Sequence, residues 1–115
     1  MPYVALQCRR PRRRSVSYDR AMLERMIERI PPGRVTRHGI LARALGTIPR
    51  AVAPAVCLSQ SHGRIRVVLK GGLFPHQDDL ADCRRRAVVL EREGVAISAD
   101  RRRVLVSEEE MWIPR

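Results

Sequence analysis

The segment Pro31-Pro32-Gly33 constrains the fold of this chain more than any other, because a helix cannot run through it. Before it, apolar residues at spacings of three and four predict a helix over residues 18–30, with Ser17 as the cap at its start. The first half of the chain is therefore expected to consist of short helices rather than one long helix.

Two shorter helices are expected after this break. The first covers residues 37–45 with Thr36 as its N-cap, and Gly46 suits the left-handed position that follows a helix end. The second covers residues 49–58 and begins at a proline, which the first turn tolerates. Pro54 lies inside this second helix and either bends it or shortens it. Two short helices joined by a tight glycine turn are typical of a helix-turn-helix.

The second half of the chain predicts a little β-structure around one longer helix. Residues 64–69 are a strand candidate followed by a turn at residues 71–72, and residues 95–97 and 104–106 suggest a small hairpin. A helix is expected over residues 78–93. Its outer face carries Arg84, Arg85, Arg86 and Arg92. The expected fold class is mostly α with small β elements, arranged as a winged helix-turn-helix-like DNA-binding domain.

The charge of the chain indicates a polyanionic partner. Lysine and arginine total 23 against 12 acidic residues, which gives a net charge of +11, and Lys70 is the single lysine. Arginine forks bind phosphate and base edges, so nucleic acid is the expected partner, with a merely solubilising surface charge as the alternative. Residues 1–14 are expected to form a basic, flexible arm that touches phosphates or is a plain tail, and residues 15–115 a single domain.

Membrane, secreted and metal-binding classes are not expected. The sequence has no apolar run near the roughly 18 residues of a membrane span, and no secretion signal is visible. Cys8, Cys57 and Cys83 lack metal-ligand spacing and form no cluster with histidine, so no cofactor is expected. The protein is expected in the cytoplasm, and with the nucleoid if its source is prokaryotic.

Six segments in one order resemble the DNA-binding domain of alkylguanine-DNA alkyltransferases. The resemblance covers residues 18–115 and begins with Ile30-Pro31-Pro32-Gly33-Arg34-Val35-Thr36, which is similar to the family's Ile-Pro-x-Gly-x-Val-x-Thr. The other segments are Leu41-Ala42-x-Ala44-Leu45-Gly46, Arg50-Ala51-Val52-Ala53, Arg66-Val67-Val68, Leu90-Glu91-Arg92-Glu93-Gly94-Val95 and Trp112-x-Pro114.

The same resemblance implies that the family's reaction is lost. Its members transfer an alkyl group to a cysteine that is activated by a histidine, and a glutamate orients that histidine. Arg64 and Ile65 stand at the cysteine and histidine positions, and Glu93 is left without partners. A guanidinium is not an alkyl acceptor and isoleucine takes no proton. The chain therefore resembles the alkyltransferase-like proteins, which bind alkylated DNA without repairing it.

DNA recognition is implied to be retained. In the family an arginine of the recognition helix enters the base stack in the minor groove while the target nucleotide is flipped out. Arg50 matches this arginine, or is an ordinary exposed arginine near a helix start. Ala51 and Ala53 permit close approach to the groove or serve helix packing, and His38 replaces a tyrosine at the target phosphate or is a surface residue. The remaining expected DNA-binding residues are Thr36, Arg37, Arg64 and Arg66.

Three functions follow from these patterns. The favoured one is a non-catalytic protein that recognises alkylated or distorted double-stranded DNA through an arginine wedge, holds a flipped base and passes lesions to excision-repair proteins. The alternative is a winged-helix transcriptional regulator or a general DNA-coating protein. The third is an enzyme with altered chemistry that uses Cys57.

Overall fold

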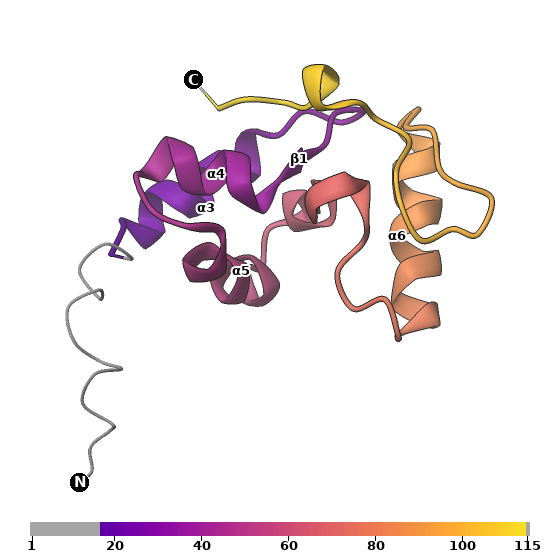
Figure 1. Cartoon of the computed structure of the whole chain (residues 1–115), viewed down its shortest axis with the longest axis horizontal. Coiled ribbons are helices and arrows are strands. Elements are labelled where there is room, and N and C mark those ends of the chain that lie inside the picture. Colours follow the sequence, from indigo (N-terminus) through magenta and orange to yellow (C-terminus); the bar gives the residue numbers. More distant parts are fainter. Residues whose placement is uncertain (1–16, 115) are drawn as a thin grey trace, which may run out of the picture.

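The computed structural model describes residues 17–114, and the predicted basic arm over residues 1–14 lies outside them (Figure 1). Helices and a small sheet within these residues confirm the expected mostly-α class. In chain order the elements are α3 (Arg20–Arg29), β1 (Thr36–Arg37), α4 (His38–Leu45), α5 (Pro49–Leu58), the 3-10 helix η1 (His62–Arg66), β2 (Val67–Val68), η2 (Lys70–Gly72), α6 (Leu80–Arg92) and η3 (Glu108–Glu110).

Local capping sets the ends of these helices. α3 begins after Asp19 rather than at the predicted cap Ser17, because the Asp19 carboxylate accepts the backbone N–H groups of Ala21 and Met22 at 2.9 and 3.2 Å. α4 ends at Gly46 as expected, with φ at 74°. This left-handed conformation strains a residue that carries a β-carbon, so glycine allows the sharp turn into α5.

The helix-turn-helix is formed by α4 and α5, whose axes are bent by 110° relative to each other. This angle falls within the range of about 90–120° that is typical of the motif. α5 continues through Pro54, so the predicted shortening is wrong. Pro54 is exposed, and the carbonyl four residues earlier, which proline cannot serve, can bind water instead. Within residues 17–114 no single helix has the length and apolarity of a membrane span, and α4 and α5 reach them only when counted together across their bend.

The β-structure differs from the prediction. The first half of the expected strand over residues 64–69 belongs to the 3-10 helix η1, and only Val67–Val68 form a strand, parallel to β1 with Thr36 opposite Val67. η1 packs closely against α3, because a β-carbon at Gly63 would collide with the backbone carbonyl of Ile27. The expected C-terminal hairpin is present as a short antiparallel pairing. Ile97 and Val104 form an isolated bridge, and the backbone N–H groups of Leu105 and Ser98 donate to the carbonyls of Ala96 and Arg103 at 2.8 and 3.0 Å.

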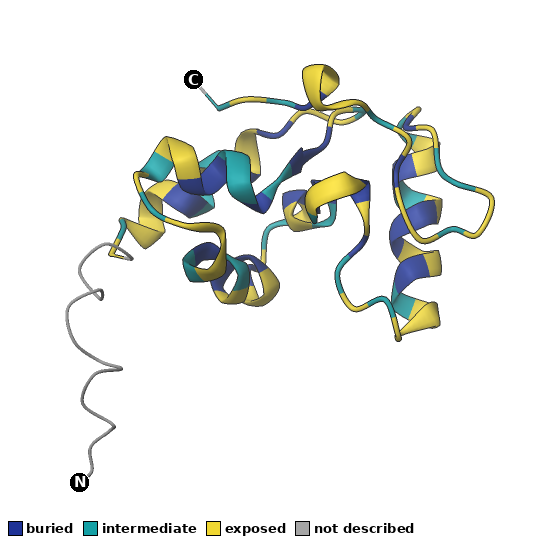
Figure 2. Ribbon diagram, viewed as in Figure 1, coloured by how far each residue is buried: buried dark blue, intermediate teal, exposed yellow. Residues whose placement is uncertain are grey.

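Two hydrophobic clusters flank this small sheet. One joins α3, α4 and α5 with Val67, and the other joins α6 with Val68, Phe74 and Val104. Consecutive strand residues point to opposite faces, so Val67 and Val68 contribute to different clusters. Figure 2 shows the buried residues along the inner faces of the helices. β1 and β2 therefore connect the helix-turn-helix to the half of the molecule that carries α6.

Candidate nucleic-acid interface

Arg50 is exposed at the second position of α5, and no ion pair to it occurs within residues 17–114. A hydrogen bond stabilises the first turn of α5, because the Tyr18 hydroxyl donates to the Ala51 carbonyl at 3.2 Å. A long cationic side chain is thus presented on a helix whose first turn is anchored to the N-terminal side of α3. Arg43 of α4 is also exposed and adds charge to the same motif.

A pocket of about 110 Å³ opens beside α5. Ala53, Val56 and Cys57 form its helical wall. Loop and strand residues complete the apolar lining, and four basic side chains also reach it. The apolar residues are Val67, Leu69 and Pro75, and the basic ones are His38, Arg64, His76 and Arg86. Small and apolar walls with a few polar groups are typical of a binding site.

His38 is buried, with 7% of its surface exposed, so its interpretation as a surface residue is wrong. Its Nδ1 lies 3.2 Å from the Val68 carbonyl. Because a carbonyl only accepts, Nδ1 carries the proton in this bond. Burial lowers the pKa of His38, opposed by the Val68 bond and reinforced by the nearby positive charge of Arg86. The ring is therefore neutral at neutral pH, which leaves no charged imidazole to attract a phosphate.

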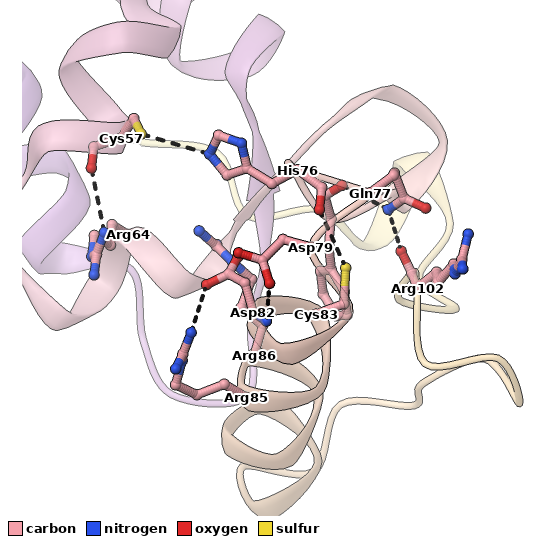
Figure 3. Close-up of polar contacts among 11 residues, drawn as sticks. Cys57, Arg64, His76, Gln77, Asp79, Asp82, Cys83, Arg85, Arg86 and Arg102 are labelled. Carbon is pink, nitrogen blue, oxygen red and sulfur yellow. Dashed lines mark hydrogen bonds and ion pairs between the residues drawn. The ribbon is translucent and has the colours of Figure 1, made fainter.

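Arg64, Cys57 and His76 meet at the pocket (Figure 3). The Arg64 guanidinium donates to the Cys57 carbonyl at 3.3 Å, and the Cys57 sulfur lies 3.7 Å from Nε2 of His76. His76 has a φ of 60°, which is uncommon for a residue other than glycine. No carboxylate orients His76 within residues 17–114, so the arrangement lacks the third member of a cysteine–histidine–glutamate relay.

Glu93, which was expected to lack the partners of the family's relay, is engaged in internal contacts instead. Its carboxylate accepts from Nε and a terminal nitrogen of Arg66 at 2.9 and 2.6 Å, and from the backbone N–H of Gly33 at 3.2 Å. The remaining Arg66 nitrogen donates to the Ile30 carbonyl at 3.0 Å. The Arg66 hydrogen bonds, helped by the one from Gly33, hold the pKa of Glu93 below its usual value against the effect of burial.

The overall arrangement matches solved structures. S. pombe Atl1 in complex with damaged DNA containing O6-carboxymethylguanine has a TM-score of 0.67 and 27% sequence identity to this chain, covering 83% of it and 94% of the S. pombe chain. A structure of S. pombe ATL in complex with DNA gives a TM-score of 0.67 and 26% identity over the same shares. This chain has the alkyltransferase-like fold. No protein-family model matches its sequence, and no curated protein matches it.

The alkyltransferase-like fold separates the predicted DNA-binding residues into two groups. Arg50 and Arg64 are exposed, and Ala51 and Ala53 lie half-buried on the recognition helix. The other group lies inside the molecule or is engaged there: Thr36 is fully buried in β1, His38 is buried, Arg66 is paired with Glu93, and the half-buried Arg37 donates to Glu108 at 2.8 Å. Thr36 is also not the N-cap of α4, because Arg37 occupies that position.

Two residues of the pocket in this alkyltransferase-like fold were missed by the sequence analysis. His76 lies in a loop without periodicity, so no pattern marks its direction. Arg86 was assigned to the outer face of its helix with its arginine neighbours, but it is 7% exposed and its Nε donates to Asp82 at 2.9 Å. The available signal was the spacing of four residues from Asp82, which places the two side chains on one helix face.

Proposed function

We propose that this chain is a non-catalytic protein that recognises alkylated or distorted double-stranded DNA. The observation that carries the proposal is the likeness, over 83% of the chain, to a protein solved on damaged DNA. The exposed Arg50 and the adjoining pocket support it, because they provide a wedge and a receptor for a displaced base on one motif. The unpaired charge of the recognition helix suits a phosphate-lined groove.

The recognition helix α5 offers both parts of such a site. Arg50, Ala53 and Cys57 are spaced by three and four residues, so they share one face of the helix. Ala53 and Cys57 line the pocket, and Arg50 projects from the same face one turn earlier. With α5 in the minor groove, a nucleotide displaced by Arg50 would meet the pocket along the same face. The small side chain of Ala53 leaves room for it.

Alkyl transfer is not part of this proposal. Arg64 lines the pocket, and by the resemblance it stands at the position of the family's nucleophile, whereas Ile65, at the histidine position, offers no base. The thiol that does line the pocket, Cys57, has His76 beside it but no Glu93, which is committed to Arg66. A protein that binds a lesion without removing it needs a repair enzyme to complete the task, and excision-repair proteins are the proposed partners.

We expect no change in the mass of the protein after incubation with DNA that contains O6-methylguanine. The reason is that the activated thiol of the family reaction is missing. Intact-protein mass spectrometry over hours, at a molar excess of DNA, measures the outcome. A gain of one methyl group, absent in Cys57→Ser, would instead identify Cys57 as the acceptor and make the protein an enzyme.

The proposal as a whole is tested by comparing one duplex sequence with and without a single O6-methylguanine. We expect the damaged duplex to bind at least about 10-fold more tightly, because flipping a damaged base avoids part of the few kcal/mol that a sound pair requires. Both titrations use one salt concentration, since phosphate contacts make affinity strongly salt-dependent. Equal affinities would favour the transcriptional regulator or the DNA-coating protein.

A further inference from the structure

Arg86 is a buried cation whose hydrogen-bonding capacity is only partly used. Its side chain is 9% exposed, and its Nε donates to Asp82 at 2.9 Å. One terminal nitrogen, Nη1, is buried and has no hydrogen-bond partner among residues 17–114. A buried donor of a charged group without an acceptor is unfavourable, and native structures rarely keep one without a reason. Arg86 lines the pocket beside α5, so an occupant of that pocket can supply the missing acceptor.

The surroundings of Arg86 favour an acceptor that is negatively charged. The side chains around the pocket include two arginines, Arg64 and Arg86, and no carboxylate of residues 17–114 lines it. Asp82 neutralises part of the charge of Arg86 but is shared with Arg85, which lies 3.4 Å from it (Figure 3). Two guanidinium groups at a small, partly apolar cavity make a positive potential that water screens weakly.

We propose that the pocket prefers a displaced base whose adduct carries a carboxylate over one whose adduct is neutral, and that Arg86 determines this preference. The inference rests on the proposed function, because it needs a displaced base in the pocket. A guanidinium matches the two oxygens of a carboxylate through parallel N–H bonds, which are stronger than those to a neutral acceptor. Nη1 of Arg86 can donate such a bond to a carboxylate in the pocket, and the exposed Arg64 adds a second positive charge to the pocket lining.

Three duplexes of one sequence test this preference. The first carries O6-carboxymethylguanine, the second its neutral amide, O6-carbamoylmethylguanine, and the third is undamaged. The amide has nearly the same size, so the comparison isolates charge. We expect the carboxylate duplex to bind about 10-fold more tightly than the amide duplex, which is the lower bound for a hydrogen bond to a charged group. In Arg86→Met the two affinities are expected to become equal within about twofold.

Arg84→Met is the matched control, because Arg84 lies on the same helix, is exposed, and loses the same charge. It should keep the preference for the carboxylate. If Arg86→Met fails to fold, Arg86→Lys replaces it, and a preference reduced below the wild-type value is expected because lysine lacks the fork. An undiminished preference in either Arg86 variant would overturn the role of Arg86.

Protection of Cys57 shows directly whether the adduct enters the pocket. Cys57 is exposed and lines the pocket, whereas Cys83 is buried, so a maleimide should label Cys57 in a Cys8→Ser background. The carboxylate duplex should slow this labelling more than the undamaged duplex at equal saturation.

The outcomes separate this inference from the proposed function. If both damaged duplexes bind equally well and more tightly than the undamaged one, the selectivity is wrong and the proposed function stands. A uniform loss of affinity for all three duplexes in Arg86→Met would make Arg86 a phosphate contact and overturn the inference. If no damaged duplex is preferred, the proposed function itself fails.

Discussion

Replacing Glu93 by alanine is expected to lower the free energy of unfolding by about 3 kcal/mol, the lower end of the loss typical of breaking a buried ion pair from one side, because this pair is only partly buried. Arg66, with 10% of its side chain exposed, would keep only its bond to the Ile30 carbonyl. The Gly33 N–H would lose its acceptor as well. The total free energy of unfolding of a small domain is about 5–15 kcal/mol, so the variant should unfold at a markedly lower denaturant concentration.

The ion pair between Arg66 and Glu93 also predicts that the stability of the fold depends on pH. The pKa of Glu93 is lowered in the folded protein, so folding gains stability from its ionisation. This contribution is complete above the pKa of an unfolded glutamate, about 4.3, and is lost as the pH falls through the lower folded value. Urea titrations between pH 3 and 7 should show a steeper acid loss in the wild type than in Glu93→Gln.

A double variant provides the control for this prediction. Arg66→Met together with Glu93→Leu removes both charges and should recover much of the stability that Glu93→Ala loses, because no unpaired charge remains buried. A loss below 1 kcal/mol in Glu93→Ala would show that water already screens the pair. The expected effect assigns Glu93 a structural role, since it ties the end of α6 to η1 and to the turn after α3.

The local elements could be predicted from the sequence because their determinants are local. Apolar periodicity is visible within a few residues of sequence. Pro49 begins one helix and Gly46 follows the end of another, and the structure has both residues at these expected positions. Thr36 was mistaken for a cap because its type suits a cap, whereas pairing with Val67 places it in a strand. That pairing joins segments that are distant in sequence, and no local pattern reports it.

The candidate site was predicted less completely for the same reason. Arg66 and Glu93 are 27 residues apart, and a chain so rich in exposed arginine gives no sign that Arg66 is buried and paired. His38 was read as a surface residue because histidine at a helix start often is one, but packing against Val68 buries it. Arg50 was correctly expected to be exposed. The sequence pattern that predicts its helix is local, and it places Arg50 on the outer face of that helix.

Arg50→Ala is expected to reduce the affinity for a damaged duplex by about 10- to 100-fold, corresponding to the roughly 1–3 kcal/mol that one stacking contact with a base contributes. Arg50→Lys should recover only part of the loss, because it keeps the charge but lacks the flat, forked guanidinium. Arg43→Ala is the matched control, since Arg43 is an exposed arginine of the same motif. Arg43→Ala should weaken binding equally for damaged and undamaged DNA, and it should reduce the slope of log affinity against log salt by about one.

Base displacement distinguishes a wedge from a phosphate contact at Arg50. A 2-aminopurine placed opposite or beside the lesion fluoresces more strongly when it is unstacked. The wild-type protein should brighten it, more at a lesion than in sound duplex, because displacement costs less there. Arg50→Ala should bind at high concentration without brightening it, whereas Arg43→Ala should brighten it fully at saturation. If the wild type saturates the duplex with no change in fluorescence, α5 lies on DNA without displacing a base, and the pocket beside it has no displaced base to receive.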